Sequence, residues 1–404
     1  MRALDTIIMI LFCAVAYCYL VYPYLIRLLA RYFPSRTITD ENMLPRVSII
    51  LAVYNEEIMI ERCLESILAL DYPKENIEIL IGSDGSTDLT SVIAEKYCAR
   101  YPFIRFYPFS ERRGKMPVLN DLAVIASGEI LFFADADITL SPNTLKTQLR
   151  HYADSSVGAV GGLYHIHAES GNGLYSSEKE YASLEQQIRI SEGIFSSSMG
   201  VFGGNYTIRR ELWNPLPDPL VHDDLYVALS VISQKKRVIY EPESHSVDFY
   251  DRSLEEEFRR KSRSASRGYH TISFFPKLLG VSGGKNMFLL WSHKILRWLS
   301  PFIFIVILFL SILGISLYGN SYYSAVVFAF GAAGLVTLLG WLFERMSIRV
   351  PLVRQFTWLV IMNIAYISGT LTYLMKTDEG AWKQATRQNL ANPPYTVKEA
   401  IHTK

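Results

Sequence analysis

Two carboxylates stand at the end of one short apolar segment, Ile130–Ala134. This segment is too short for a helix and is typical of a strand buried on both faces of a sheet. Asp135 and Asp137 follow it directly. Alternate residues of an extended chain project to the same side, so both carboxylates can converge on one point. Such a pair indicates either a hydrated turn or a site for a hard divalent cation such as Mg²⁺ or Mn²⁺.

Other polar clusters also follow predicted strands. The apolar run Val47–Val53 is followed by Tyr54-Asn55-Glu56-Glu57, and Ile77–Ile81 is followed by a loop that reaches Asp88. Predicted helices separate these strands, and one of them opens at Gly114-Lys115. The alternation predicts an α/β fold with a mostly parallel sheet and helices on both faces. Ligands of such sheets bind at the carboxyl ends of the strands, where these clusters fall.

Two later clusters each have two interpretations. Gly203 and Gly204, before Asn205, would let the backbone approach a ligand, but a tight bend explains them equally well. Asp223 and Asp224 open a predicted helix, where acids also serve as ordinary N-terminal caps.

A basic cluster lies on the predicted helix Glu255–Arg267. A basic helix beside a membrane often contacts lipid head groups, but the same cations could bind an anionic ligand, which we favour slightly. The cations are Arg259, Arg260, Lys261, Arg263 and Arg267.

Composition divides the chain into membrane and aqueous parts. The 404 residues carry a formal charge of +1 and are 50% hydrophobic, which excludes a disordered chain and a nucleic-acid binder by bulk charge. Four uncharged stretches are candidates to cross a bilayer: Ile7–Ile26, Phe302–Leu317, Tyr322–Phe343 and Phe356–Met375. The charged middle, from about residue 45 to 285, is expected to be one aqueous domain.

Flanking cations predict the orientation. Three arginines follow the first apolar stretch within ten residues and only Arg2 precedes it, so we expect a retained anchor in the cell membrane and a cytosolic middle domain. Four crossings would then put the tail outside, although the lysines of the tail favour the cytosol. One span, around Ser347–Met375, is therefore expected to be re-entrant or interfacial.

Taken in order along the chain, these motifs resemble those of family 2 glycosyltransferases. The resemblance covers roughly residues 45–300 and is strongest to membrane-integrated members, such as cellulose, hyaluronan and poly-N-acetylglucosamine synthases. It implies a GT-A fold, a nucleotide-diphosphate sugar donor with UDP as the expected nucleotide, a divalent metal, and inversion at the anomeric carbon. The motifs are Asn55-Glu56, Ser83–Asp88, Gly114-Lys115, Asp135-Ala136-Asp137 and Asp223-Asp224-Leu225.

The resemblance also implies roles for single residues. Asp84 would read the base, while Asp135 and Asp137 would bind the metal and the diphosphate. Asp224 would be the general base, next to Asp223 where the family usually has Glu, and Arg263 would clamp the departing diphosphate. The donor-binding set would be Ala52, Tyr54, Glu56, Asp84, Lys115, Asp135 and Asp137, and the acceptor-binding set Gly203, Gly204 and Asn205.

One segment departs from the family pattern. Processive members carry Gln-x-x-Arg-Trp where this chain has Arg260-Lys261-Ser262-Arg263-Ser264. The arginine is kept, but the aromatic platform for an acceptor sugar is replaced by Ser264. This departure puts chain elongation through the membrane in doubt.

These observations divide the chain into five predicted segments. They are an anchor and connector (1–44), a GT-A catalytic domain (45–250), basic and amphipathic interfacial helices (251–300), C-terminal transmembrane helices (301–376) and a polar tail (377–404). Within the third segment, Asn286–Leu299 is expected to lie in the membrane interface.

The sequence therefore favours a glycosyltransferase of cell-surface or exopolysaccharide synthesis, whose partners are a nucleotide sugar, a glycan or lipid-linked acceptor and the bilayer. A single-transfer enzyme acting on a polyprenyl phosphate or lipid is the nearest alternative. A nucleotidyltransferase or a non-enzymatic membrane protein ranks lower. The enzyme hypothesis requires Asp135, Asp137, Asp224 and Arg263 to surround one cleft.

Overall fold

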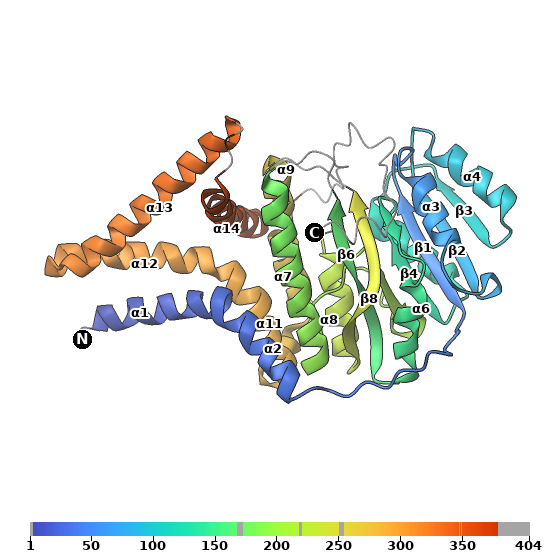
Figure 1. The fold of residues 1–404 in the computed structure, drawn as a ribbon, viewed down its shortest axis with the longest axis horizontal. Helices are drawn as coiled ribbons and strands as arrows, with labels where there is room; N and C mark the ends of the chain where they lie inside the picture. The colour runs from blue at the N-terminus through green and yellow to red at the C-terminus, as the bar shows by residue number, and fades with distance from the viewer. Residues whose placement is uncertain are drawn as a thin grey trace.

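One eight-stranded sheet with helices on both faces forms the centre of the protein (Figure 1). The computed structural model describes residues 3–167, 173–217, 220–249, 254–346, 348 and 350–378. The strands are β1 (Val47–Val53), β2 (Ile77–Asp84), β3 (Ile104–Phe109), β4 (Ile130–Ala134), β5 (Ile138–Leu140), β6 (Val157–His167), β7 (Tyr206–Arg209) and β8 (Arg237–Phe249).

The sheet has a parallel half and a mixed half. Its strand order is β3-β2-β1-β4-β7-β6-β8-β5. The first four strands are parallel, β7 is antiparallel to β4 and β6, and β5 is antiparallel to β8. This arrangement confirms the predicted α/β fold. Because Leu51 of β1 pairs with Ala134 of β4 and Val53 pairs with Ser83 of β2, the residues that follow these three strands meet at one edge.

Both faces of β1 are buried, as its uncharged sequence predicts. Ile49 and Leu51 pack under α3 (Ile60–Leu68), α4 (Thr90–Arg100) and α6 (Thr144–Leu149). Ile50 and Ala52 belong to the opposite core, which contains α5 (Lys115–Ile125), α7 (Gly173–Phe195) and α8 (Asp223–Ser233). Buried residues of α2 (Tyr22–Tyr32), α11 (Lys285–Leu290) and α12 (Leu296–Tyr318) extend this second core. The sheet domain is therefore joined to the apolar helices by continuous packing.

Four helical runs in the described part of the chain are long and apolar enough to cross a membrane, which matches the four predicted stretches. The first joins α1 (Ala3–Ala16) to α2 through a π-helical turn, and the second joins α11 to α12 through another. The other two are α13 (Ser321–Arg345) and α14 (Pro351–Met375). Figure 1 shows α1, α12 and α13 extending away from the sheet, while α14 is seen nearly end-on beside α7 and α9 (Leu254–Ser273).

The segment Asn286–Leu299, which we expect to lie in the membrane interface, is helical but is not a separate helix. It belongs to the continuous run from Lys285 to Tyr318, which follows the short helix α10 (Pro276–Leu279). His293 and Arg297 are buried because they pair with carboxylates of α7. Of the predicted polar tail, only Thr377 and Asp378 lie within the described residues.

Candidate active site

The turn into α5 is fixed by a buried carboxylate at the end of β2. Asp84 accepts the backbone N–H of Arg113 at 2.7 Å and that of Gly114 at 2.8 Å, one with each carboxylate oxygen. Gly114 has a φ of 93°, a backbone conformation that a residue with a side chain rarely adopts. Asp84 thereby sets the position of Lys115, the first residue of α5.

The loops after β1 and β2 are held together by Asn55. Its side-chain oxygen accepts the backbone N–H of Thr87 at 2.8 Å, and its own N–H donates to Ser86 Oγ at 3.1 Å. Asn55 tolerates the left-handed φ of 51° that this turn requires. Beside it, the Arg112 guanidinium lies 4.0 Å from the centre of the Tyr54 ring. Three segments far apart in sequence therefore form one rigid edge.

Lys115 joins two carboxylates that the sequence places almost ninety residues apart. Its ammonium nitrogen lies 2.7 Å from Asp135 Oδ1 and 3.3 Å from Asp223 Oδ2. Burial lowers the pKa of Lys115, but the two carboxylates outweigh burial and raise it. Burial also raises the pKa of Asp135, and Asp137 adds to that rise against the opposing effect of Lys115. Lys115 thus partly neutralises an edge that carries several acids.

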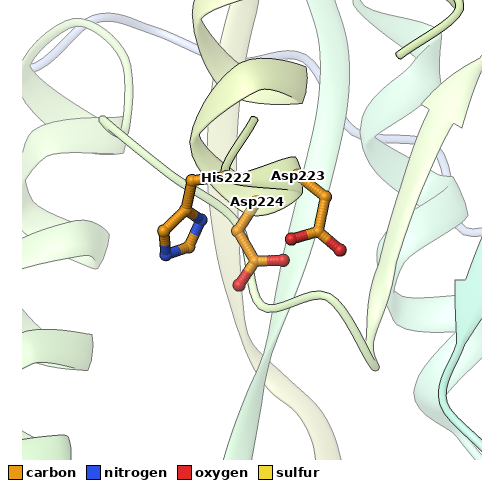
Figure 2. A group of neighbouring side chains, drawn as sticks. All are labelled: His222, Asp223 and Asp224. Atoms are coloured by element: carbon orange, nitrogen blue, oxygen red, sulfur yellow. The ribbon is translucent and has the colours of Figure 1, made fainter. Parts of the chain in front are cut away.

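Asp224 lies at the N-terminus of α8, where Figure 2 shows its carboxylate between the His222 ring and the Asp223 carboxylate. A Cβ added to Gly203 would lie 2.5 Å from Asp224 Oδ1, so a side chain at this position would displace the Asp224 carboxylate. Burial and the neighbouring Asp223 raise the pKa of Asp224 to about 7. A carboxylate with this pKa can accept a proton near neutral pH.

One cavity of about 340 Å³ contains the residues that the enzyme hypothesis requires together. Asp135, Asp137, Asp224 and Arg263 all line it. Carboxylates from the sheet edge and α8 form what we call the acidic wall: Asp135, Asp137, Asp223, Asp224 and Asp248. Cations from α7, α9 and the run Lys285–Tyr318 form the cationic wall: Arg189, Arg260, Lys261, Arg263, Arg267, Lys294 and Arg297.

Much of the cationic wall was missed at the sequence level. Glu185 on α7 pairs with His293 at 3.0 Å, and with Lys294 and Arg297 at 2.8 Å each. Burial raises the pKa of Glu185, but these three partners together lower it well below its ordinary value. Lys294 and Arg297 are three residues apart and share one face of an otherwise apolar helix, which indicates buried pairing. That spacing was the available signal.

The basic side chains of α9 differ in their exposure to solvent. Lys261, Arg263 and Arg267 line the cavity, whereas Arg259 is exposed and pairs with exposed Glu255. Ser264, at the position of the family tryptophan, lies 2.9 Å from His222 Nε2. Most of the basic cluster therefore faces the acidic wall.

Several predicted site residues lie outside the described lining of this cavity. Ala52 and Glu56 are buried, Asp84 is held by backbone N–H groups, and Tyr54 packs on Arg112. Their donor-binding roles remain predictions for the neighbouring edge of the sheet.

The three predicted acceptor residues also do not line the cavity, although Phe202 beside them does. Asn205 is fully buried, accepts a hydrogen bond from Gln148 Nε2 at 2.7 Å and donates one to the Leu163 carbonyl at 3.2 Å. Its amide is therefore used in the core, and a direct acceptor contact by Asn205 is not supported. Gly203 supports Asp224 instead, and Gly204 packs near Ile138.

Part of the chain is similar to a known protein family. Residues 48–214 match the family described as Glycosyl transferase family 2. These residues therefore resemble a family 2 glycosyltransferase domain. The matched range contains the strands β1 to β7 and the carboxylates Asp84, Asp135 and Asp137, and it ends before α8. Asp224 and Arg263 are therefore assigned to the site by the shared cavity, outside the matched range.

Relatives of the glycosyltransferase domain include two curated proteins. The chain is 27% identical over 159 residues to glycosyltransferase AglE of Haloferax volcanii, which is 39% of this chain and 52% of AglE. It is 29% identical over 204 residues to poly-beta-1,6-N-acetyl-D-glucosamine synthase of Staphylococcus aureus, which is 48% of each protein. The chain thus spans about half the length of these curated relatives.

A solved structure shares the fold of almost the whole chain. It is the mannosyltransferase PcManGT of Pyrobaculum calidifontis in complex with GDP-Man and Mn²⁺. The two superpose with a TM-score of 0.70 and 21% sequence identity over 92% of this chain and 100% of the other. This likeness confirms the GT-A fold.

Two groups of residues in the glycosyltransferase fold could hold a divalent metal. Asp135 and Asp137 offer carboxylate oxygens, which Mg²⁺ and Mn²⁺ prefer, and the raised pKa of buried Asp135 indicates negative charge that a cation would relieve. His222, Asp223 and Asp224 bring one donor atom each within 4.8 Å of one another. In that group Asp223 pairs with Lys115 and His222 with Ser264. Lys115 also pairs with Asp135 at 2.7 Å, so these contacts leave both groups as candidates for the metal.

Proposed function

We propose that this chain is an inverting, metal-dependent glycosyltransferase that moves a sugar from a nucleotide-diphosphate sugar to a glycan or membrane-bound acceptor in cell-surface or exopolysaccharide synthesis. The observation that carries this proposal is the single cavity lined by Asp135, Asp137, Asp224 and Arg263. Asp135 and Asp137 lie at a sheet edge, Asp224 at the start of a helix and Arg263 on the basic helix. A transfer reaction needs a metal site, a general base and a cation for the diphosphate, and these residues would supply them.

The donor proposal rests on the family 2 domain and on the shared GT-A fold. PcManGT was solved with GDP-Man and Mn²⁺, which supports a nucleotide-diphosphate sugar and a divalent cation for this chain as well. Asp135 and Asp137 would hold the cation, which when bound would neutralise the departing diphosphate. Arg263 would contact the same diphosphate from the cationic wall.

The chain's own residues account for the proton in this reaction. In a direct displacement the acceptor oxygen forms a bond to the anomeric carbon while the bond from that carbon to the diphosphate oxygen breaks. The proton of the acceptor hydroxyl goes to Asp224, whose pKa of about 7 suits a general base. Lys115 stabilises the negative charges of Asp135 and Asp223 beside Asp224. The nucleoside diphosphate is the leaving group.

The membrane helices support an acceptor that is held at the bilayer. Trp298 of α12 and Tyr366 of α14 line the same cavity as Asp224. The similarity to a polysaccharide synthase favours a glycan acceptor. Ser264 in place of an aromatic platform favours a single transfer to a lipid or polyprenyl phosphate. Product length separates these two candidates.

The proposed orientation puts the catalytic domain in the cytosol and the protein in the cell membrane. Because α14 packs along α9 and α7, it would lie in the interface while α1, α12 and α13 cross. Three crossings return the chain to the cytosol, which agrees with the basic residues of its tail.

Nucleotide release from purified protein in detergent tests the proposal. A panel of UDP and GDP sugars is supplied with Mn²⁺ or Mg²⁺ and with lipid and glycan acceptors. We expect release with one donor, its loss in EDTA, and its recovery when the metal is restored. Matched Asp224→Asn protein must bind the donor but release little nucleotide. Wild-type protein that releases nothing with any pairing of donor and acceptor contradicts the proposal.

A further inference from the structure

The cationic wall holds more positive charge than its carboxylates balance. Glu185 faces three basic side chains, because Arg189 lies 3.4 Å from it and both Lys294 and Arg297 lie 2.8 Å from it. All four side chains are largely buried. One carboxylate compensates only one of the three cations.

The second carboxylate of this region, Glu192, does not remove the imbalance. His293 Nδ1 lies 2.8 Å from Glu192, and His293 Nε2 lies 3.0 Å from Glu185. Both nitrogens of the His293 ring therefore lie against carboxylates. Tyr22 donates its hydroxyl to Glu192 at 2.6 Å and adds no charge. Within the described residues, Glu192 is thus occupied by His293 and Tyr22, while Arg189, Lys294 and Arg297 share Glu185.

The excess extends to the neighbouring helix α9. Lys261 Nζ lies 4.4 Å from the centre of the Tyr181 ring and 3.5 Å from Glu257. Arg260 contacts the same Glu257 at 2.6 Å. Arg297 donates to the Tyr181 hydroxyl at 3.1 Å. Burial raises the pKa of Tyr181, yet Arg297, Lys261 and other cations lower it below its ordinary value, which indicates a positive potential at this point.

Several buried cations that share one carboxylate are costly, so their presence in a cavity points to an anionic ligand. The Tyr181 and Glu185 region lines the cavity together with Trp298 and Tyr366 of the apolar helices. The predicted nucleotide residues at the ends of β1 and β2 lie outside this lining. The anion is therefore expected on the side of the membrane helices, across from Asp135 and Asp137.

We propose that the cationic wall binds a phosphate group of a lipid-linked acceptor, with Arg189, Lys294 and Arg297 around the phosphate and Trp298 against the lipid chain. This inference rests on the proposed function and names its acceptor class. The phosphate binds without reacting, and no bond to phosphorus forms or breaks. The hydroxyl that attacks the donor belongs to the sugar carried by that phosphate, and its proton goes to Asp224.

Binding of small probes to the full-length protein in detergent tests this assignment. Farnesyl phosphate, farnesol and glucose 1-phosphate are titrated while tryptophan fluorescence is followed. We expect farnesyl phosphate to bind at least about tenfold more tightly than farnesol, as one charge-assisted contact implies, and less tightly as salt rises. Equal binding of farnesyl phosphate and farnesol overturns the phosphate site. Equal binding of glucose 1-phosphate and farnesyl phosphate overturns the lipid-linked acceptor.

Opposite substitutions in one salt bridge separate binding from structural support. Lys294→Gln should weaken farnesyl phosphate binding about tenfold and leave farnesol binding unchanged, because Glu185 keeps Arg297 and His293 as partners. Glu185→Gln should tighten farnesyl phosphate binding, because it removes negative charge. Arg259→Gln on the exposed side of α9 is the matched control and should change neither.

Melting temperatures of the three variants show whether each is folded. If Lys294→Gln and Glu185→Gln both lower the melting temperature and neither changes the ratio of farnesyl phosphate to farnesol binding, the cluster is structural only and the inference fails.

Nucleotide-sugar binding to the same protein, with Mn²⁺ present, tests the proposed function separately. If the protein binds a nucleotide sugar but binds farnesyl phosphate and farnesol equally, the proposed function stands and this inference is wrong. If the protein binds farnesyl phosphate but no nucleotide sugar, the proposed function is wrong and the phosphate site stands.

Discussion

The two walls of the cavity are built in different ways. The acidic wall comes from the ends of strands and the first turn of one helix, where short motifs such as Asp135-Ala136-Asp137 fix the side chains locally. The cationic wall comes from α7, α9 and the run Lys285–Tyr318, which are separated by long stretches of sequence. The groups proposed for chemistry therefore lie in local motifs, whereas the surroundings proposed for the acceptor are created by helix packing.

Charge is also shared in opposite ways. In the acidic wall one cation, Lys115, serves Asp135 and Asp223. In the cationic wall one carboxylate, Glu185, serves Arg189, Lys294 and Arg297. Each wall thus keeps an excess of its own sign. An acidic wall suits a metal and a proton acceptor, and a cationic wall suits an anionic substrate group.

The largest expected effect is on the base of the acidic wall. Asp224→Asn should lower the turnover number by about 10²- to 10⁴-fold, the usual contribution of a general base. Because burial raises the pKa of Asp224 to about 7, its charge destabilises the fold above that pH. The variant should therefore melt at a higher temperature than wild type at pH 8 in EDTA. Turnover within threefold of wild type would remove Asp224 from the mechanism.

The shared cation of the acidic wall should matter next. Lys115→Met leaves Asp135 and Asp223 without their common partner, and breaking such a pair costs about 3 kcal/mol in unfolding free energy. Chemical denaturation in EDTA measures this loss. Added Mn²⁺ should restore more stability to the variant than it adds to wild type, because the metal can replace the ammonium. An equal effect of Mn²⁺ on both proteins would contradict a metal site at Asp135.

His222 reports on the boundary between the walls. Burial lowers its pKa to about 4, and the cations Lys294 and Arg189 add to this effect against Asp223. Protonation is thus harder in the folded than in the unfolded protein, so stability is full above pH 6.5 and is lost as pH falls towards 4. His222→Gln should lose less stability over this window. Parallel denaturation curves for the two proteins would show that His222 titrates normally.

The smallest effect is expected at the contact between His222 and Ser264. Ser264→Ala removes a partner at 2.9 Å from a ring whose Nδ1 already lacks one in the described structure, which should cost about 1 kcal/mol. Thermal melting measures the loss, with Ser273→Ala on the exposed end of α9 as the control. Product length should not change, because the alanine supplies no aromatic surface. Longer products would mean that Ser264 itself limits elongation.

Much of the fold was predictable because its signals are local. Uncharged runs such as Val47–Val53 identified buried strands, and four long apolar stretches identified the candidate spans. The antiparallel placement of β7 between β4 and β6 was not predictable, because strand order depends on long-range pairing. The pairing of His293 and Arg297 with α7 was also not predictable, because it depends on contacts between distant helices.

The residues of the candidate site were likewise predictable where their sequence signals are local. Asp135, Asp137 and Asp224 were predicted from motif and resemblance, and the cavity brings them together with Arg263. The burial of the Asn205 amide was not predictable, because a buried hydrogen-bond network leaves no signal in sequence spacing. Glu185 and Arg189 were missed because a polar-faced helix has the same pattern whether it faces water or the charged side chains of another helix.

Transfer of a labelled sugar tests the central claim, that the two walls serve one reaction between a nucleotide sugar and a membrane acceptor. The full-length protein in nanodiscs receives a radiolabelled nucleotide sugar, Mn²⁺ and a lipid acceptor carrying a diphosphate-linked sugar. We predict that the label moves into the organic phase, that Asp224→Asn abolishes the transfer, and that Lys294→Gln reduces it while Arg259→Gln does not. Label that stays in the aqueous phase in wild-type protein, or transfer that persists in Asp224→Asn, would contradict the account.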